Sequence, residues 1–491
     1  MPKTLITAIV LWTAIAGFAA ASEIPGRPEK IDFPDLTFEV PDAEAMRFEL
    51  PNGTPVYLQE DHQLPLVNIA VYFKGGAYMV ATEKAGLTDI ISDAWRAGGA
   101  GDLSAQELDE ALDFIAANVR ASIGDVQGSA SLNVMTKDLE QAMGLFMDVL
   151  TEPRFQEDRF AKAKDDLLQA MKRRNDNTAS IERREWDRLI FGDGFWMNQL
   201  ATKPTLDNIT IEDCRSLVSR LVRADNIIIA VSGDIDRPTA MKLLTPTLGA
   251  LPKLDEAIPA VPQPDYSPEP GVYVVNKSDV NQGRVRIGHI GYKLGDEDEF
   301  ALRVGNDILG GGGFTARMMK TIRSDEGLAY GAYSRLQFPV TIPGVFSAFF
   351  QTKSSTCAYA SEIAFDLIED MRRNAVTAEE LTTSKASFVE TFPRRFESAA
   401  ATVAQFAQGE LLGRPADYWQ TYRDRISAVT AEDIRKAMNE KIHPDKLVVL
   451  VVGNVEEIMK GHPDHQAQMS DFGAIHTLPL RDPLTLEPLA E

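Results

Sequence analysis

The chain has 491 residues, 44% hydrophobic and 25% charged, which is the composition of a folded protein with more than one domain. Its 50 basic and 72 acidic residues give a net charge of −22, and this argues against a nucleic-acid partner because no cationic surface awaits phosphate. The acidity fits either basic peptide ligands or a solvated surface that keeps the protein soluble.

Residues 1–21 predict a secretory signal peptide. Lys3 precedes an uncharged apolar run over 5–18, and three alanines precede Ser22, so we place cleavage after Ala21. The apolar run is too short to span a bilayer, although a retained anchor is the alternative. No later run reaches 18 apolar residues. We therefore expect no stable membrane anchor and a periplasmic location, with secretion as the alternative.

The first half, residues 22–250, alternates strand and helix patterns. Residues 67–73 predict a strand, Ser104 and Glu107 form a capping-box pattern, and an apolar stripe from Leu139 predicts a further helix. Residues 251–271 contain six prolines and predict a stiff, extended linker that can hinge two halves.

The second half, residues 272–470, repeats the mixture. Residues 285–290 predict a strand, residues 362–371 a helix, and Thr377 with Glu380 the cap of another helix. Residues 471–491 lack clear periodicity and predict an extended tail.

An internal repeat relates the two halves. Thr-Ile-Glu-Asp-Cys-Arg at 210–215 is echoed by Thr-Ala-Glu-Asp-Ile-Arg at 430–435, and the run 225–234 is echoed by 445–454. The offset is 220 residues throughout, without a gap. Each copy predicts a capped helix and then a buried strand that ends at a glycine turn. A duplicated domain of this length is the economical interpretation.

The cysteines and histidines predict no metal centre. Cys214 and Cys357 allow one disulfide or two separate thiols, and they exclude a disulfide framework or a thiolate cluster. His462, His465 and His476 lie near the C-terminus, where such a cluster can scavenge a transition metal. A proline between the first two breaks helical spacing, and no glutamate base accompanies them.

A glycine turn follows the first strand, and a Gly-Leu pair within residues 84–94 then begins a helix. This arrangement resembles the insulinase/pitrilysin metallopeptidases. In that family the helix carries H-x-x-E-H, whose histidines bind zinc and whose glutamate activates water. The three positions here are Asp89, Ser92 and Asp93, and the third-ligand position falls at Ala170, or at Gln169 in a shifted register. Asp89 and Asp93 could bind a hard cation such as calcium, but two carboxylates make a poor site. The resemblance implies that this chain binds no metal.

The second half matches the family's other signature. Four glycines and a phenylalanine precede Arg323, and Tyr330 ends Gly-Leu-Ala-Tyr. The resemblance implies that Arg323 and Tyr330 stabilise an oxyanion at a zinc site. The alternative is that the two residues only anchor a turn, with Gly327 permitting a positive φ. We expect the glycine-rich segment to approach a bound peptide; its members are Gly310, Gly311, Gly312, Gly313 and Phe314.

The resemblance covers residues 38–459 and implies an α+β fold. It implies two homologous domains, each a mainly antiparallel sheet with helices on one face, that together form half of a clam shell. It also implies a subunit without a cofactor of its own, which binds peptides and supplies Arg323 and Tyr330 to a homologous zinc-bearing subunit. One alternative is a catalytically inactive peptide-binding or scaffolding protein. Another is a self-sufficient hydrolase that uses Asp89 and Asp93.

Overall fold

The structure is a computed structural model that describes residues 27, 31 and 37–489. The predicted signal peptide, residues 1–21, lies outside the described residues. The chain divides into two units, Met1–Glu39 and Val40–Glu491, and all the elements below belong to the second unit. Among the described residues no helix is both long enough and apolar enough to cross a membrane.

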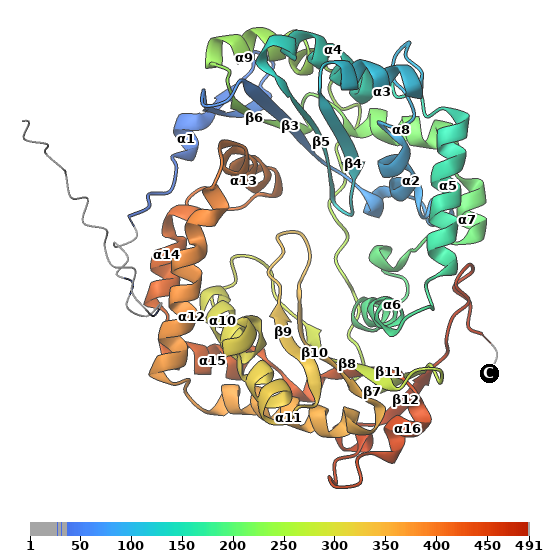
Figure 1. The fold of residues 1–491 in the computed structure, drawn as a ribbon, viewed down its shortest axis with the longest axis vertical. Helices are drawn as coiled ribbons and strands as arrows, with labels where there is room; N and C mark the ends of the chain where they lie inside the picture. The colour runs from blue at the N-terminus through green and yellow to red at the C-terminus, as the bar shows by residue number, and fades with distance from the viewer. Residues whose placement is uncertain (1–26, 28–30, 32–36, 490–491) are drawn as a thin grey trace, which may run out of the picture. The chain divides into compact units, whose positions relative to one another are not determined.

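The first half builds a six-stranded sheet with the order β1-β2-β6-β3-β5-β4 (Figure 1). All neighbours are antiparallel except β2 and β6, which run parallel. In β3 the side chains alternate between buried and half-buried, as expected for a strand with one face on a core. The strands are β1 (Arg47–Glu49), β2 (Pro55–Glu60), β3 (Leu66–Lys74), β4 (Asn118–Ile123), β5 (Gln127–Met135) and β6 (Ile227–Gly233).

Nine helices accompany this sheet in the described part of the first half. The predicted capping box of Ser104 and Glu107 is present at the start of α3. Figure 1 shows α3, α4 and α8 over one face of the sheet. The helices are α1 (Ala43–Met46), α2 (Leu87–Ala94), α3 (Ala105–Phe114), α4 (Leu139–Thr151), α5 (Glu157–Lys172), α6 (Thr178–Phe191), α7 (Lys203–Asn208), α8 (Ile211–Leu221) and α9 (Arg237–Leu244).

The second half builds a matching sheet with the order β12-β7-β11-β8-β10-β9. Here β7 runs parallel to β11 and β12, and the other pairs are antiparallel. The strand β12 comes from the predicted tail, so that segment contributes to the sheet. The strands are β7 (Gly271–Asn276), β8 (Gln282–Ile290), β9 (Ala329–Leu336), β10 (Val345–Lys353), β11 (Val448–Gly453) and β12 (Ile475–Leu478).

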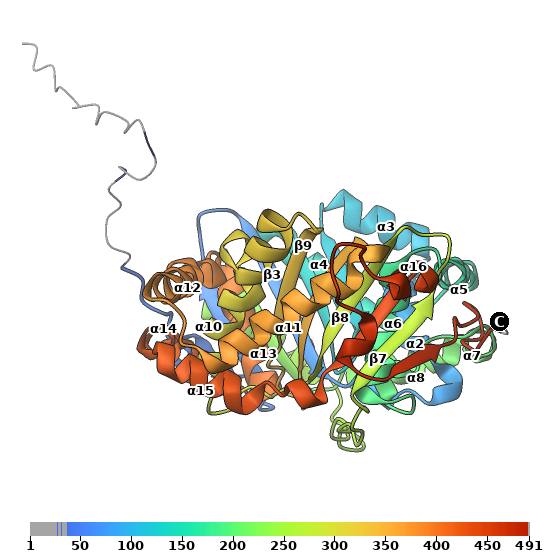
Figure 2. The ribbon, with the colours of Figure 1, turned by 90° about the horizontal axis from the view of Figure 1, so that it is seen from below.

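The helices of the second half include the predicted cap of Thr377 and Glu380, which begins α12. Two π-helical segments, Asp307–Gly311 and Met319–Asp325, lie between α10 and β9. Figure 2, a view from below, shows α11 in front of the second sheet. The helices are α10 (Glu299–Asn306), α11 (Cys357–Arg373), α12 (Ala378–Thr391), α13 (Ala399–Leu412), α14 (Tyr418–Ala428), α15 (Ala431–Lys441) and α16 (Val455–Lys460).

The sequence repeat is also a structural repeat. Helices α8 and α15 both begin after a threonine that forms a capping box with the third helical residue. Strands β6 and β11 follow them and occupy the same third position in their sheets. The two α+β halves with mainly antiparallel sheets therefore confirm the predicted fold class.

Each half also lends one helix to the other half's sheet. Helix α6 of the first half packs on β8 and β11, and α13 of the second half packs on β2, β3 and β6. Every residue of β6 and β11 is buried, because these two strands are covered on both faces. The sequence predicted helices on one face of each sheet, and the exchanged helices add a layer on the other.

Candidate functional site

The helix that corresponds to the zinc-binding helix is α2, and it carries Asp89, Ser92 and Asp93. The Ser92 hydroxyl donates to the carbonyl of Thr88 at 2.8 Å and accepts from the backbone N–H of Ile123 at 3.1 Å. Ser92 therefore links α2 to β4. A general base at this position would need a free carboxylate instead. Ala170 lies in α5 and offers only a methyl group.

A recess of about 250 Å³ opens beside α2, lined by Asp89, Asp125 and Arg174 among others. Burial raises the pKa of Asp89, the neighbouring carboxylates of Asp93 and Asp125 raise it further, and Arg174 opposes them. Burial and the nearby Arg184 lower the pKa of Arg174 to about 10, so its guanidinium stays charged at neutral pH.

This donor set does not fit zinc. Within the described part of the chain no group of three His, Cys, Asp or Glu side chains is arranged to hold a metal ion. Zinc in proteins takes imidazole, thiolate or carboxylate ligands in a tetrahedral arrangement. The charged groups that line the recess are two carboxylates and a cation, and the Ser92 hydroxyl on the same helix is already bonded to backbone.

Arg323 and Tyr330, far from Asp89 in sequence, form a preorganised pair with Phe314. Arg323 lies in the π-helical segment Met319–Asp325 and Tyr330 near the start of β9. The guanidinium carbon lies 4.6 Å from the Phe314 ring centroid and 5.5 Å from that of Tyr330. Tyr330 is 90% exposed and Phe314 71% exposed. A cation between two ring faces keeps its N–H edges directed outward as donors.

The glycine-rich segment has two distinct roles in the structure. Gly310 is buried, and a Cβ there would lie 2.2 Å from the backbone nitrogen of Ser334 in β9. Gly313 adopts a φ of +64°, which favours glycine. Gly311 and Gly312 lie at the surface or near it. Gly310 thus allows the π-helical segment to press on the strand that carries Tyr330. Peptide contact by the segment stays a prediction.

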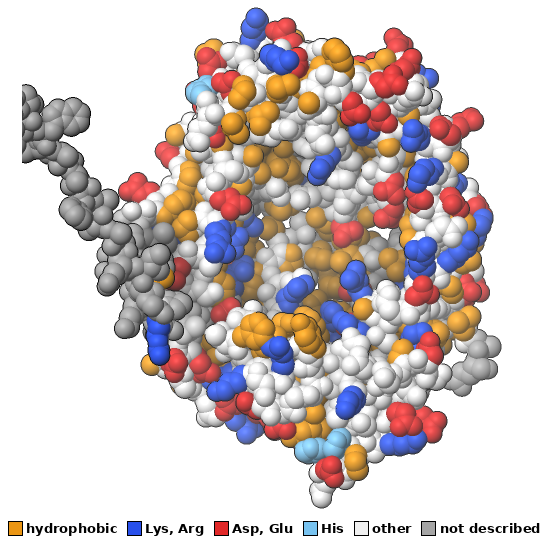
Figure 3. All heavy atoms as spheres, viewed as in Figure 1, with side chains coloured by type: hydrophobic (Ala, Val, Ile, Leu, Met, Phe, Trp, Pro, Cys, Tyr) orange, Lys and Arg blue, Asp and Glu red, His pale blue; other side chains and the backbone are white. Residues whose placement is uncertain are grey.

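The opposite end of β9 reaches a larger recess that sequence analysis did not predict. This recess, about 780 Å³, is lined by residues 335–339 together with α6 residues Trp186, Asp187 and Phe191. It shares Asp125 with the recess beside α2. The surface is hollowed between the two sheets, and blue basic side chains lie around the hollow together with red acidic and orange hydrophobic ones (Figure 3). No local motif marks this recess, because its walls come from both halves.

Asp187 is the most perturbed carboxyl group of this larger recess. Burial raises its pKa to about 6, while the nearby arginines 286 and 183 oppose that rise. Its carboxylate is thus only partly charged at mildly acidic pH. Arg335, at the end of β9, is exposed on the same wall.

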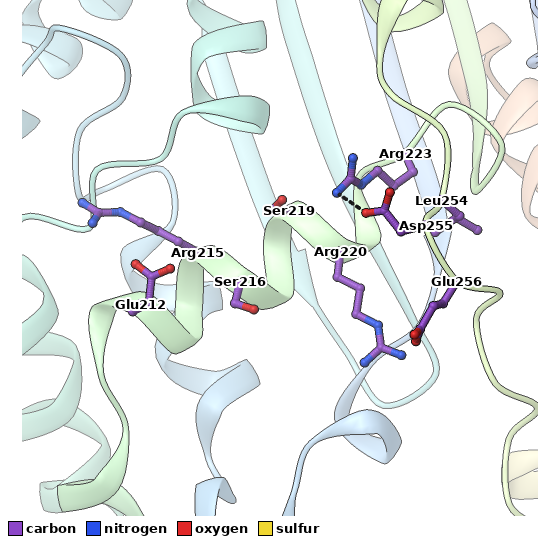
Figure 4. Close-up of a pocket in the computed structure, with 9 residues that line it drawn as sticks. All are labelled: Glu212, Arg215, Ser216, Ser219, Arg220, Arg223, Leu254, Asp255 and Glu256. Carbon is purple, nitrogen blue, oxygen red and sulfur yellow. Dashed lines mark hydrogen bonds and ion pairs between the residues drawn. The ribbon is translucent and has the colours of Figure 1, made fainter.

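A third recess, of about 550 Å³, lies along α8 and contains three arginines (Figure 4). Arg223 approaches Asp255 at 3.4 Å, and Arg215 donates to the backbone carbonyls of Pro153 and Arg154. Three acidic residues line the same recess, so their charges offset those of the arginines. The recess contains none of the predicted site residues.

The histidines near the C-terminus do not converge on one point. The rings of His462 and His465 lie 4.8 Å apart, and His465 stacks on Tyr359. His476, in β12, stacks on Tyr273 with ring centroids 4.8 Å apart. Cys214 and Cys357 are both buried and free.

The fold and these sites define a metallopeptidase-like protein whose own metal position lacks zinc ligands. Residues 55–190 match the family described as insulinase (peptidase family M16), and residues 208–388 match the description peptidase M16 inactive domain. The chain belongs to the M16 peptidase family, as the sequence resemblance predicted.

Curated relatives and solved structures agree with this assignment. "Non-peptidase homolog YmxG" of Helicobacter pylori is 24% identical over 407 residues, covering 82% of this chain and 92% of the relative. "Uncharacterized zinc protease YmxG" of Bacillus subtilis is 21% identical, covering 82% and 97%. A peptidase M16 inactive domain from Pseudomonas fluorescens has the same fold, with a TM-score of 0.75 at 23% identity over 83% of this chain and 97% of that one.

Proposed function

We propose that this protein is the non-metal subunit of a two-chain zinc peptidase, to which it supplies Arg323 and Tyr330. The carrying observation is the exposed, preformed stack of Phe314, Arg323 and Tyr330. Tyr330 and Arg335 are five residues apart on β9, a separation of roughly 16 Å along an extended strand. The pair is therefore removed from the recess that adjoins this chain's metal-free α2 region.

In the proposed complex a homologous partner holds the zinc and the general base. The phenol of Tyr330 and the guanidinium of Arg323 donate hydrogen bonds to the oxygen of the scissile carbonyl as negative charge develops on it. The peptide substrate lies extended and pairs with an exposed strand edge, which gives affinity with little sequence preference. Zinc, when bound by the partner, supplies the activated water.

The test is reconstitution with the partner that copurifies from the native source. We expect peptide cleavage only in the mixture, and about a 100-fold loss of kcat with Arg323→Ala or Tyr330→Phe, the typical cost of one oxyanion donor. Tyr333→Phe is the matched control, because Tyr333 lies exposed on the same strand. A mixture that keeps full activity with both residues replaced would contradict the proposal.

A second candidate function is peptide binding or scaffolding without hydrolysis. The observation that favours it is the similarity to a relative named a non-peptidase homolog. This function requires that labelled peptides bind the chain while no copurifying mixture cleaves them. Arg323→Ala then changes no rate and affects peptide affinity at most.

We also propose that the chain is exported to the periplasm, because residues 1–21 have the three regions of a signal peptide. Cell fractionation with N-terminal sequencing tests this. Recovery of a mature chain that begins at Ser22 in the periplasmic fraction supports it, and an intact Met1 in the cytoplasm contradicts it.

A further inference from the structure

Arg174 lies where the metal-free recess meets the end of α5. It lies two residues beyond the last helical residue, Lys172, and about one turn after Ala170, the position of the missing third ligand. One of its terminal nitrogens, Nη1, donates to the carbonyls of Ala201 at 2.7 Å and Pro483 at 3.1 Å. The guanidinium is thereby fixed from two sides, by the segment before α7 and by the C-terminal segment.

The C-terminal segment, residues 481–484, contacts the first half at several further points. The carbonyl of Arg481 accepts from the Asn175 amide at 2.8 Å, and the Arg481 side chain lies 3.3 Å from Glu185. The carbonyl of Leu484 accepts from the backbone N–H of Lys203 at 2.8 Å, and its side chain packs against the first-half core. These contacts hold the Pro483 carbonyl in place beneath Arg174.

The carboxylates around the recess need a nearby cation to offset their negative charge. Asp89 and Asp125 line it, and Asp93 follows one turn later on α2. Among the described residues that line the recess, Arg174 is the one basic side chain. A half-buried cation interacts with such carboxylates more strongly than it would in bulk water, because the local dielectric constant is lower.

We propose that Arg174 replaces the metal as the resident cation of this recess and thereby excludes zinc. Its guanidinium compensates Asp89, and the C-terminal segment fastens it there. A divalent ion entering the recess would meet a positive charge that two carbonyls hold in place. The charge of Arg174 and the packing that holds it therefore both oppose metal binding. Restoring the missing ligands alone does not restore a zinc site.

The test restores the ligands by four substitutions, Asp89→His, Ser92→Glu, Asp93→His and Ala170→Glu, with and without Arg174→Leu. Zinc affinity is measured by competition with a chromophoric chelator, and zinc content by mass spectrometry after gel filtration. We expect zinc to bind at least tenfold more tightly when Arg174 is replaced. Equal affinities with and without Arg174 overturn the proposal.

A matched control carries the same four substitutions with Arg173→Leu. Arg173 is the exposed neighbour of Arg174, so its replacement removes an equal charge. We expect this control to bind zinc as weakly as the fourfold variant itself. A gain as large as that of Arg174→Leu would show a general charge effect and overturn the proposal.

A second measurement does not require the fourfold variant to fold. Asp89→Asn, Arg174→Gln and their combination are compared by thermal unfolding in the otherwise unchanged chain. If Arg174 compensates Asp89, the combined variant loses less Tm than the sum of the two single losses. Strictly additive losses contradict the pairing. Both measurements are independent of peptide cleavage, so their outcome does not depend on the proposed function.

Discussion

Close backbone contact at Gly310 links the glycine-rich segment to the strand that carries Tyr330. The Ser334 hydroxyl donates to Asn306, the residue before the π-helical segment, and so joins the same two elements. A side chain at position 310 must push this contact apart. We therefore expect a methyl group at position 310 to displace β9, which carries Tyr330.

Gly310→Ala is expected to destabilise the protein by about 2–3 kcal/mol, because the added Cβ meets backbone that cannot move aside. Urea unfolding at neutral pH measures the change. Gly144→Ala is the control, since Gly144 is exposed within α4 and its Cβ would meet nothing within 4 Å. That variant should be unchanged or more stable by about 0.5–1 kcal/mol. Equal effects at both positions would refute the packing role of Gly310.

Asp187 makes stability depend on pH. Its folded-state pKa of about 6 lies above the ordinary value of 3.8, so the folded protein holds the proton more tightly than the unfolded chain does. Stability from this group is therefore present at low pH and is lost as pH rises from about 4 through 6. Each unit of pKa difference corresponds to about 1.4 kcal/mol.

Asp187→Asn should remove this loss. Relative to the unchanged protein, we expect the variant to gain about 1–3 kcal/mol between pH 4 and pH 7 and nothing further above that. Urea unfolding at several pH values measures the difference. Asp424→Asn, an exposed change of the same type in α14, is the control. A flat difference for Asp187→Asn would contradict the raised pKa.

At the scale of elements, each exchanged helix is fixed by one glutamate. Glu182 of α6 is 2% exposed and binds Arg284 and Arg286 of β8. Glu410 of α13 accepts two hydrogen bonds from Arg47 of β1, both at 2.9 Å. Tyr57 of β2 donates to the same carboxylate at 2.6 Å. Each sheet thus binds a helix from the other half through an ion pair as well as through apolar packing. The ion pair adds a specificity that apolar packing alone would not provide.

Replacement of Glu410 by Gln is expected to cost about 1–2 kcal/mol, because it removes the charge that accepts two part-buried hydrogen bonds from Arg47 and leaves Arg47 only its exposed pair with Glu49. Thermal unfolding measures the loss. Glu397→Gln serves as the control, since Glu397 is exposed just before α13. An equal loss in the two variants would show that the Arg47 contact contributes no stability of its own.

At the scale of the whole unit, the exchange makes the two halves interdependent. Isolated, the second half would expose Val448, Leu450 and Val452 of β11, which pack with α6. The linker is also held in place, because Tyr78 and Trp196 donate to the carbonyls of Pro259 and Pro262. These two hydrogen bonds join the linker to the first half.

A cut in the linker should leave the protein intact. A protease site inserted between Asp255 and Glu256, both exposed, can be cleaved after folding. We expect the two fragments to elute together on gel filtration and to separate only in denaturant. Fragments expressed singly should aggregate, since each lacks the helix that covers its sheet. Separation of the cleaved fragments in native buffer would disprove this interdependence.

The sequence was sufficient to predict local helices and strands and the family signatures. The capping residues Ser104, Thr210, Thr377 and Thr430 each begin a helix as predicted, because a cap depends on a hydrogen bond within three residues. For Arg323 and Tyr330 the sequence predicted a shared role in stabilising an oxyanion, and it did not predict that the two side chains stack. The contact of the Phe314 ring with the guanidinium was not predicted, and peptide binding by Phe314 stays a prediction.

By itself, the sequence determined the fold class, the duplication, and the absence of zinc ligands at Asp89, Ser92 and Asp93. These features depend on residue identity and short-range spacing. Only the tertiary structure decided that α6 and α13 are exchanged and that Arg174 lines the metal-free recess. It alone placed Pro483 beside Arg174. Those facts join residues up to 363 positions apart, and no local pattern records a contact over such a distance.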